Sequence, residues 1–337
     1  MTAPQWVPTS QDVDDARVTD FARFAGRPDS DYHSLWQWSV DEPEAFWAAL
    51  WTYFGFGDAP PVVLENPQMP GARWFPGTQL NYVDQVVRNA RTDRPAVLYV
   101  REDAPIVELS WAELLGRTAA FARRLRSLGV TAGDRVVGYV PNIPEAIIAF
   151  LATASIGAIW SACGQDYSAK AALDRLGQLE PVVLVAADGY RFGGKWHDKS
   201  DDIAALQAGL PTLRATVMAS ELSEVGDDLD VEQVDFDHPL WILFSSGTTG
   251  LPKGIMHGHG GVVLEHLKAV ALQSDIGSDD TFFWYTSPSW MMWNFQVAGL
   301  LVGATIVCYD GSPNAPKPDS LWEIAARVRA TVLGTSP

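Results

Sequence analysis

The sequence predicts an α/β protein whose mostly parallel sheets are covered by helices. Strand-like and helix-like segments alternate along the middle and the end of the chain, and repeated strand–helix units of this size are typical of such sheets. Hydrophobic residues make up 47% of the 337 residues, which is enough for a large core. This length fits two domains, or one large domain with subdomains.

The first 80 residues or so are rich in tryptophan. Residues 43–54 carry apolar side chains at helical spacing, namely Phe46, Trp47, Leu50, Trp51 and Phe54. We expect this helix to dock its aromatic face on the main body, because large aromatic side chains are mostly buried. An aromatic ligand site is the alternative.

The middle of the chain supplies the first strand–helix units. A helix is expected from Ser110, which forms a capping-box pattern with Glu113, to Gly129, a residue type that commonly ends helices. Pro144 suits the first position of another helix. The order that follows Gly129 is a strand at 136–140, a helix from 144 to about 157, a strand at 158–162, a helix at 169–179 and a strand at 182–185.

Residues 221–237 interrupt this alternation. They contain eight acidic residues and no lysine or arginine, which predicts a solvated connection. A divalent-metal patch is the weaker alternative, because no compact set of ligands is visible. The alternation then resumes, with strands at 240–244, 282–285, 304–309 and 331–333 and helices near 260–273, 294–301 and 320–329.

Composition excludes several classes of protein. The formal net charge of −17 argues against nucleic-acid binding, which needs a basic face. Cys163 and Cys308 lie in apolar surroundings, so we expect neither a disulfide framework nor a metal site, and a reducing, cytoplasmic compartment fits.

Residues 1–6 lack the basic and apolar regions of a signal peptide. Residues 146–165 are uncharged but interrupted by serine and glycine, so a buried helix and strand are expected and no membrane insertion.

The richest motif is the stretch 244–254, Phe-Ser-Ser-Gly-Thr-Thr-Gly-Leu-Pro-Lys-Gly. Three glycines let the backbone approach an anion closely, while four hydroxyls and Lys253 add donors and positive charge. A nucleotide phosphate loop is therefore predicted. A Walker loop, as in a P-loop phosphotransferase, is disfavoured because Lys253 follows Pro252 and precedes Gly254, and this stretch has no dinucleotide glycine fingerprint. A plain Ser/Thr/Gly surface loop is the alternative.

This stretch resembles the phosphate loop of the adenylate-forming superfamily. The segment 74–82, the tryptophan-rich region before it, and the segments 141–146, 174–181 and 188–190 are similar to the acetyl-CoA synthetase branch. Residues 288–294, Pro-Ser-Trp-Met-Met-Trp-Asn, resemble the acid-pocket motif of acetoacetyl-CoA synthetases, and the chain is identified as a member of that family. Two departures stand out: Ser289 replaces the usual glycine, and residues 165–168, Gln-Asp-Tyr-Ser, replace the commoner Pro-Asp-Phe-Gly.

The resemblance implies the N-terminal large-domain portion of the adenylate-forming fold, with stacked, mostly parallel sheets covered by helices. It implies that the sequence matches only the N-terminal half of the family's chain, with the C-terminal domain outside it. The expected divisions are a tryptophan-rich extension at 1–85, a first α/β subdomain at 86–220, the acidic connection at 221–237, and a second, incomplete subdomain with the phosphate loop at 238–337.

The resemblance also implies an acid–thiol ligase that joins acetoacetate to CoA through acetoacetyl-AMP, with ATP and Mg²⁺ required. Mg²⁺ is expected to be held chiefly by ATP, with no protein metal ligands assigned. Lys253 and Thr248 are the predicted catalytic residues. The predicted phosphate-binding residues are Ser245, Ser246, Gly247, Thr248, Thr249, Gly250 and Lys253, and those of the acid pocket are Trp290, Met292, Trp293 and Asn294.

Alternatives remain at this point. An acetyl- or propionyl-CoA synthetase would use the same loop with another acid pocket. A non-catalytic nucleotide- or acyl-binding module would need only part of the machinery. His257 and His259, which follow the loop, are expected to be structural.

Overall fold

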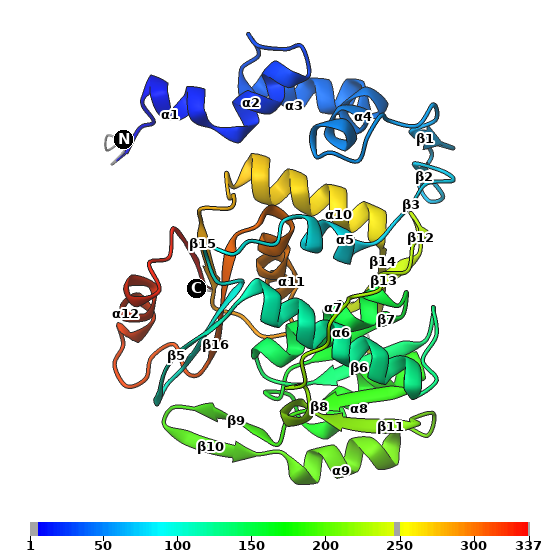
Figure 1. Ribbon diagram of the computed structural model, residues 1–337, viewed down its shortest axis with the longest axis vertical. Coiled ribbons are helices and arrows are strands. Elements are labelled where there is room, and N and C mark those ends of the chain that lie inside the picture. The colour runs from blue at the N-terminus through cyan, green and yellow to red at the C-terminus, as the bar shows by residue number, and fades with distance from the viewer. Residues whose placement is uncertain (1–5, 246–249, 336–337) are drawn as a thin grey trace.

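The computed structural model describes residues 6–245 and 250–335. A six-stranded sheet and a five-stranded sheet form the body of the described chain (Figure 1). In the larger sheet the strand order is β11 (Ala215–Met218), β8 (Val183–Ala186), β6 (Arg135–Tyr139), β7 (Ile159–Cys163), β13 (Pro239–Ser245) and β14 (Lys253–Gly258). All neighbours in it are parallel except β13 and β14, which form an antiparallel hairpin.

The second sheet is also mostly parallel. Its order is β17 (Val332–Gly334), β15 (Thr281–Trp284), β16 (Thr305–Asp310), β4 (Val97–Arg101) and β5 (Ala104–Leu109). Only β4 and β5 are antiparallel. The prediction of mostly parallel, helix-covered sheets is therefore confirmed.

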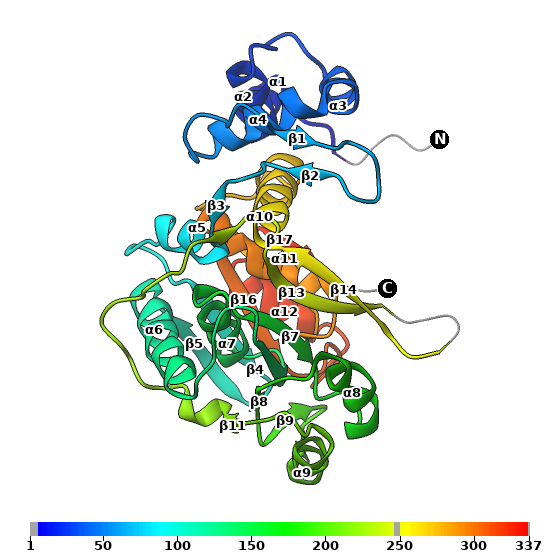
Figure 2. The same cartoon turned by 90° about the vertical axis from the view of Figure 1, so that its right-hand side faces the viewer.

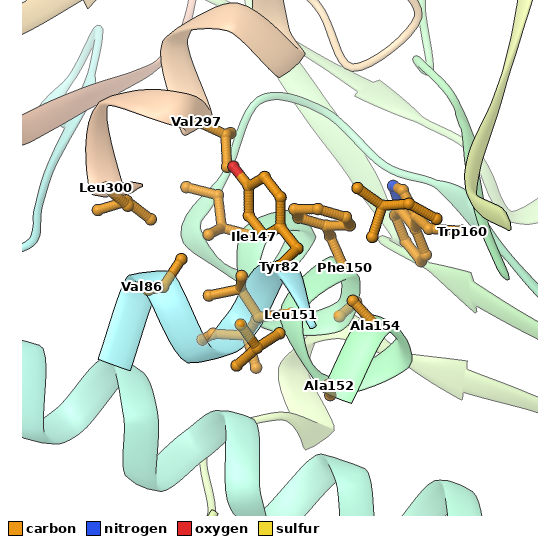
Figure 3. Close-up of a cluster of buried hydrophobic side chains, with 14 of the residues drawn as sticks. Tyr82, Val86, Ile147, Phe150, Leu151, Ala152, Ala154, Trp160, Val297 and Leu300 are labelled. Atoms are coloured by element: carbon orange, nitrogen blue, oxygen red, sulfur yellow. The ribbon is translucent and has the colours of Figure 1, made fainter. Parts of the chain in front are cut away.

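Helix α7 (Pro144–Ser155) forms the centre of the core. Every residue of α7 except Glu145 is buried. Ile147 and Phe150 of α7 pack around Tyr82 of α5 (Tyr82–Arg88), and the Phe150 and Tyr82 rings lie 5.2 Å apart (Figure 3). Because α7 is buried on all sides, its apolar residues form a continuous run, and the expected buried helix and strand at 146–165 are α7 and β7.

Other helices cover the sheets. They are α6 (Trp111–Ser127), α8 (Ala169–Leu176), α9 (Ser200–Gly209), α10 (His259–Leu267), α11 (Met291–Val297) and α12 (Ser320–Arg327). The Ser110 hydroxyl caps α6 by accepting the backbone N–H of Glu113 at 3.1 Å, and Gly129 follows that helix with φ +76°. Short turns extend three helices, namely η1 (Gly177–Leu179), η3 (Lys268–Gln273) and η4 (Ala298–Val302). No helix within residues 6–245 and 250–335 combines the length and the apolar character needed to cross a membrane.

Four helices precede the body, as the upper part of Figure 1 shows: α1 (Ser10–Asp15), α2 (Arg17–Phe24), α3 (Tyr32–Asp41) and α4 (Pro43–Tyr53). The helix predicted at 43–54 is α4, and its Phe46 packs edge-on against Phe21 of α2, with ring centroids 5.8 Å apart. This cluster packs on Ala271 and Leu272 of η3. The predicted docking of the aromatic face on the body is confirmed.

Two-stranded pairs join these parts. β1 (Leu64–Glu65) pairs with β2 (Arg73–Trp74), and β3 (Gln79–Leu80) pairs with β12 (Val234–Asp235). The acidic stretch 221–237 starts in η2 (Ala219–Glu221) and is anchored near its end through β12. A further hairpin consists of β9 (Gly189–Phe192) and β10 (Lys195–Asp198).

Candidate functional site

A cavity of about 420 Å³ lies at the carboxyl ends of the parallel strands. Its lining includes Asn142 after β6, Gln165 after β7, Tyr285 after β15 and Gly311 after β16. The carboxyl ends of parallel strands meet at one edge of a sheet, which is where α/β proteins commonly bind ligands. The β9–β10 hairpin adds three more lining residues, Tyr190, Arg191 and Phe192.

The predicted acid-pocket residues separate into two pairs. Trp290 and Met292 line the cavity, and the Trp290 side chain is 58% exposed. Trp293 and Asn294 are buried in the core and are not among the lining residues. The Trp293 indole N–H donates to Oδ1 of Asn142 at 3.1 Å, so this tryptophan holds α11 against the loop that follows β6.

The loop between β15 and α11 is tied to the larger sheet. Nδ2 of Asn142 donates to the carbonyl of Thr286 at 3.4 Å, and the Ser287 hydroxyl donates to Oδ1 of Asp166 at 3.2 Å. Trp290 follows this loop directly, and its N–H donates to the Ser287 carbonyl at 2.9 Å. The position of Trp290 therefore depends on contacts between the two sheets.

Gln165 lines the cavity and has a buried, unpaired acceptor. Its side chain is 1% exposed, and its amide N–H₂ donates to the carbonyls of Tyr139 and Ala187. Its Oε1 atom is buried and has no hydrogen-bond partner within the described part of the chain. Buried polar groups are normally paired, so this unpaired oxygen is an exception within the described part of the chain.

Asp310 lines the cavity, and the pKa of its carboxyl group is raised. Burial raises its pKa to about 7, and the nearby negative charges of Glu102 and Asp103 act in the same direction. The backbone N–H of Arg191 and the charge of Arg101 oppose this rise. Asp310 is therefore partly protonated near neutral pH, and the cavity then carries less negative charge than its composition suggests.

The phosphate-loop motif falls only partly within the described residues. Ser246, Gly247, Thr248 and Thr249 lie outside them. Ser245 ends β13 and pairs directly with Lys253, the first residue of β14 (Figure 2). Both residues are exposed, and Lys253 forms no ion pair within the part of the chain that the structure describes. The Lys253 ammonium is thus available at the base of the loop.

The hydrophobic pattern of the sequence did not predict β14. Glycine and proline at 250–254 are typical of a loop, and the next strongly patterned segment is the helix that starts at His259. Residues Lys253–Gly258 form a strand because their backbone pairs antiparallel with Pro239–Ser245 of β13.

His257 and His259 have partners in the fold. Nδ1 of His257 accepts the indole N–H of Trp241 at 3.0 Å, and Nδ1 of His259 accepts the backbone N–H of Tyr82 at 3.1 Å. Burial lowers the pKa of both imidazoles, that of His259 to about 3. These contacts agree with the structural role expected for the two histidines. Within residues 6–245 and 250–335 no group of three or more His, Cys, Asp or Glu side chains is arranged to hold a metal ion.

Several residues that line the cavity were not predicted from the sequence as site residues. Asn142 lies shortly after the predicted strand 136–140, and Gln165 and Asp166 lie shortly after the predicted strand 158–162, so their positions beyond strand ends were a usable signal. Tyr190 and Arg191 belong to a hairpin with no clear alternation, and no local signal points to the cavity.

The chain matches two protein-family models. The family model described as AMP-binding enzyme matches residues 83–337, and that of the acetyl-coenzyme A synthetase N-terminus matches residues 32–86. The chain belongs to the AMP-binding enzyme family. Within this family it is 37% identical over 90% of its length to the acetoacetyl-CoA synthetase of Macaca fascicularis, of which it covers 50%.

Two further acetoacetyl-CoA synthetases are also similar. The acetoacetyl-coenzyme A synthetase of Rhizobium meliloti (strain 1021) is 36% identical over 99% of this chain, which covers 55% of that protein. The solved acetoacetyl-CoA synthetase from Streptomyces lividans has a TM-score of 0.95 and 47% identity, with 99% of this chain and 55% of that chain covered. The chain therefore spans about half the length of these relatives.

Proposed function

We propose that the protein containing this chain ligates acetoacetate to CoA at the expense of ATP. The acetoacetate carboxylate attacks the α-phosphorus of ATP, which forms acetoacetyl-AMP and expels pyrophosphate. The CoA thiolate then attacks the acyl carbon, which forms acetoacetyl-CoA and expels AMP. The observation that carries this proposal is the 47% identity and TM-score of 0.95 over 99% of the chain with an acetoacetyl-CoA synthetase.

Lys253 is the proposed neutralising group of the first step. Charge builds on the phosphate oxygens in such a transfer, and fixed donors and cations at those oxygens lower the barrier. Lys253 is exposed and unpaired by carboxylates in the described chain, and it lies across from Ser245 at the base of the loop. We propose that Ser245, Gly250 and Lys253 contact the β- and γ-phosphates, together with Ser246, Gly247, Thr248 and Thr249, and that Thr248 assists catalysis.

The cavity supports a site for small organic substrates. Trp290 and Met292 give it an apolar wall, while Gln165 and Asp310 give it polar groups. We propose that Trp290 and Met292 form the wall against which the acid is selected. Trp293 and Asn294 also belong to α11. In this proposal they anchor that helix in the core, because both are buried and neither lines the cavity.

Mg²⁺ is the proposed metal cofactor. The ion would be bound chiefly by the phosphate oxygens of ATP, and no metal ligands are assigned in the protein. When bound it would neutralise phosphate charge.

ATP, CoA and acetoacetate are the proposed partners, without nucleic acid or membrane insertion, and the cytoplasm is the proposed compartment. We also propose that the chain divides into the parts 1–85, 86–220, 221–237 and 238–337.

The test is ATP–pyrophosphate exchange with acetoacetate, acetate and butyrate in parallel. Exchange that is strongest with acetoacetate would support the proposed acid. Exchange that is equal or stronger with acetate would replace it by an acetyl-CoA synthetase. A folded sample of this chain that exchanges with none of the acids, while ATP binding persists, would limit the chain alone to a binding module.

A further inference from the structure

The β9–β10 hairpin forms part of the cavity wall although it belongs to neither large sheet. Its two strands pair only with each other within the described chain. The hairpin leaves the larger sheet after β8 and extends below the smaller sheet (Figure 1). Tyr190, Arg191 and Phe192 of β9 line the cavity. Something other than sheet pairing must therefore hold these side chains in place.

A single carboxylate performs this role at the turn of the hairpin. Oε1 of Glu102 accepts the backbone N–H groups of Gly193 at 2.8 Å and of Ser312 at 2.6 Å. Oε2 of Glu102 accepts the backbone N–H of Gly194 at 2.5 Å. Glu102 lies between β4 and β5, and Ser312 follows β16, so three separate segments meet at this carboxylate.

The turn is shaped to receive an anion. Gly193 and Gly194 have φ values of +61° and +77°, a left-handed conformation that glycine adopts readily and other residues adopt at a cost. Successive backbone N–H groups in such turns converge into a concave anion-binding site. Here the Glu102 carboxylate of the same chain occupies that site, and hydrogen bonds to a charged acceptor are stronger than those between neutral groups.

The other attachments of the hairpin to the smaller sheet are weaker or indirect. Arg191 forms an ion pair with Asp103 at 2.9 Å, but both side chains are more than a third exposed, and such pairs contribute little. Glu102 is thus the principal fastening of the turn.

We infer that Glu102 is a positioning residue that clamps the β9–β10 turn to the end of β16. Through this clamp it sets where Tyr190, Arg191 and Phe192 stand along the cavity. Glu102 itself is not among the lining residues, so it acts through the hairpin and not on the substrate. The consequence for catalysis rests on the proposed function, while the clamp can be tested without it.

The first measurement is amide hydrogen exchange in the protein that contains this chain. Glu102→Gln keeps the size of the side chain but replaces one acceptor by a donor, and Glu102→Ala removes both acceptors. We expect exchange at Gly193, Gly194 and Ser312 to become about tenfold faster or more in both variants, as expected when charge-assisted bonds are lost. Unchanged exchange at β6 would show that the protein remains folded.

Glu108→Gln is the matched control. Glu108 lies on the adjacent strand β5, is exposed, and makes no side-chain hydrogen bond or ion pair within the described part of the chain. This variant should leave exchange at the hairpin unaltered. If Glu102→Ala exchanges at Gly193 and Gly194 as slowly as the unsubstituted protein, the clamp does not exist.

The second measurement separates positioning from a purely structural role. KM for acetoacetate or CoA should rise several-fold in Glu102→Gln while kcat changes less, because a displaced wall weakens binding without removing a reacting group. Faster hairpin exchange with unchanged KM for both substrates would overturn the positioning role. Faster exchange in a protein whose unsubstituted form has no ligase activity would support the clamp and count against the proposed function.

Discussion

The hydroxyl oxygen of Ser289 accepts a hydrogen bond from the backbone N–H of Gly164 at 2.5 Å. Gly164 follows β7 of the larger sheet, and Ser289 lies in the loop between β15 of the smaller sheet and α11. A side chain at Gly164 would collide with the Ser287 hydroxyl and the Asp166 carboxylate, so the two loops are in close contact. The two departures from the family pattern, Ser289 and the segment 165–168, therefore adjoin one another in the structure.

Ser289→Ala should weaken this contact and disturb Trp290, the next residue. It leaves the buried N–H of Gly164 without its acceptor, which costs about 1–3 kcal/mol of unfolding free energy. We expect a lower urea midpoint and a smaller preference for acetoacetate over butyrate in kcat/KM. Ser223→Ala is the control, because Ser223 is exposed and makes no side-chain hydrogen bond within the described chain. An unchanged midpoint would show that the contact contributes no stability.

Lys253→Ala should slow adenylation without altering the fold. The Lys253 side chain is exposed, so its removal leaves no cavity, but it removes the positive charge at the base of the loop. We expect a loss of about tenfold to a thousandfold in ATP–pyrophosphate exchange. Lys170→Ala provides the control, since Lys170 is 86% exposed and pairs only with Asp174 among the described residues. Exchange that stays at the unsubstituted rate would exclude a role for Lys253.

Trp290 and Trp293 should respond in opposite ways to truncation. Trp290→Ala enlarges the cavity and should broaden the acid profile with little change in stability, because the side chain is 58% exposed. Trp293→Ala should cost about 3–5 kcal/mol of stability, because that side chain is buried in the core. Acid profiles and denaturation curves of both variants decide this. A large loss of stability in Trp290→Ala, with an unaltered acid profile, would make Trp290 a core residue.

Asp310 should make acid binding depend on pH near neutrality. Burial raises its pKa to about 7, so the carboxyl is neutral below this pH and negative above it. Acetoacetate is an anion, and the ionised carboxylate would repel it inside the cavity. KM for acetoacetate should therefore rise between about pH 6 and about pH 8, and Asp310→Asn should flatten this rise. A rise of equal size in Asp310→Asn would assign it to another group.

The buried histidines should make the fold sensitive to mild acid. Burial lowers the pKa of His266 to about 4 and that of His259 to about 3, below the ordinary value of 6.5. Between these values the unfolded chain binds protons that the folded chain does not, so stability falls as pH decreases below 6.5. Each histidine contributes about 1 kcal/mol per pH unit to this slope.

His266→Leu tests this prediction directly. Nδ1 of His266 has no hydrogen-bond partner in the described chain, so the substitution removes a titrating group without breaking a bond at that atom. Unfolding free energies from urea titrations between about pH 5 and about pH 6.5 should depend less steeply on pH. Ser223→Ala, at an exposed position without a titrating group, should keep the original slope. A slope that is the same in all three proteins would contradict the prediction.

The sequence by itself determined the elements whose signals are local. The run of apolar residues from Pro144 predicted α7, and the Ser110 and Gly129 signals predicted both ends of α6. The phosphate-loop motif and the tryptophan-rich helix α4 were also readable from residue types and spacing alone. Such signals depend on backbone propensity and on side-chain periodicity, which a short segment contains in full.

Only the tertiary structure decided which motif residues meet at the cavity. Trp290, just before α11, and Met292 line it, whereas Trp293 and Asn294 are buried. Successive residues of α11 point in different directions around the helix axis. β14 and the β9–β10 hairpin likewise depend on partners distant in sequence. The Glu102 clamp joins residues separated by 91 and 210 positions, and no local pattern encodes a hydrogen bond across such separations.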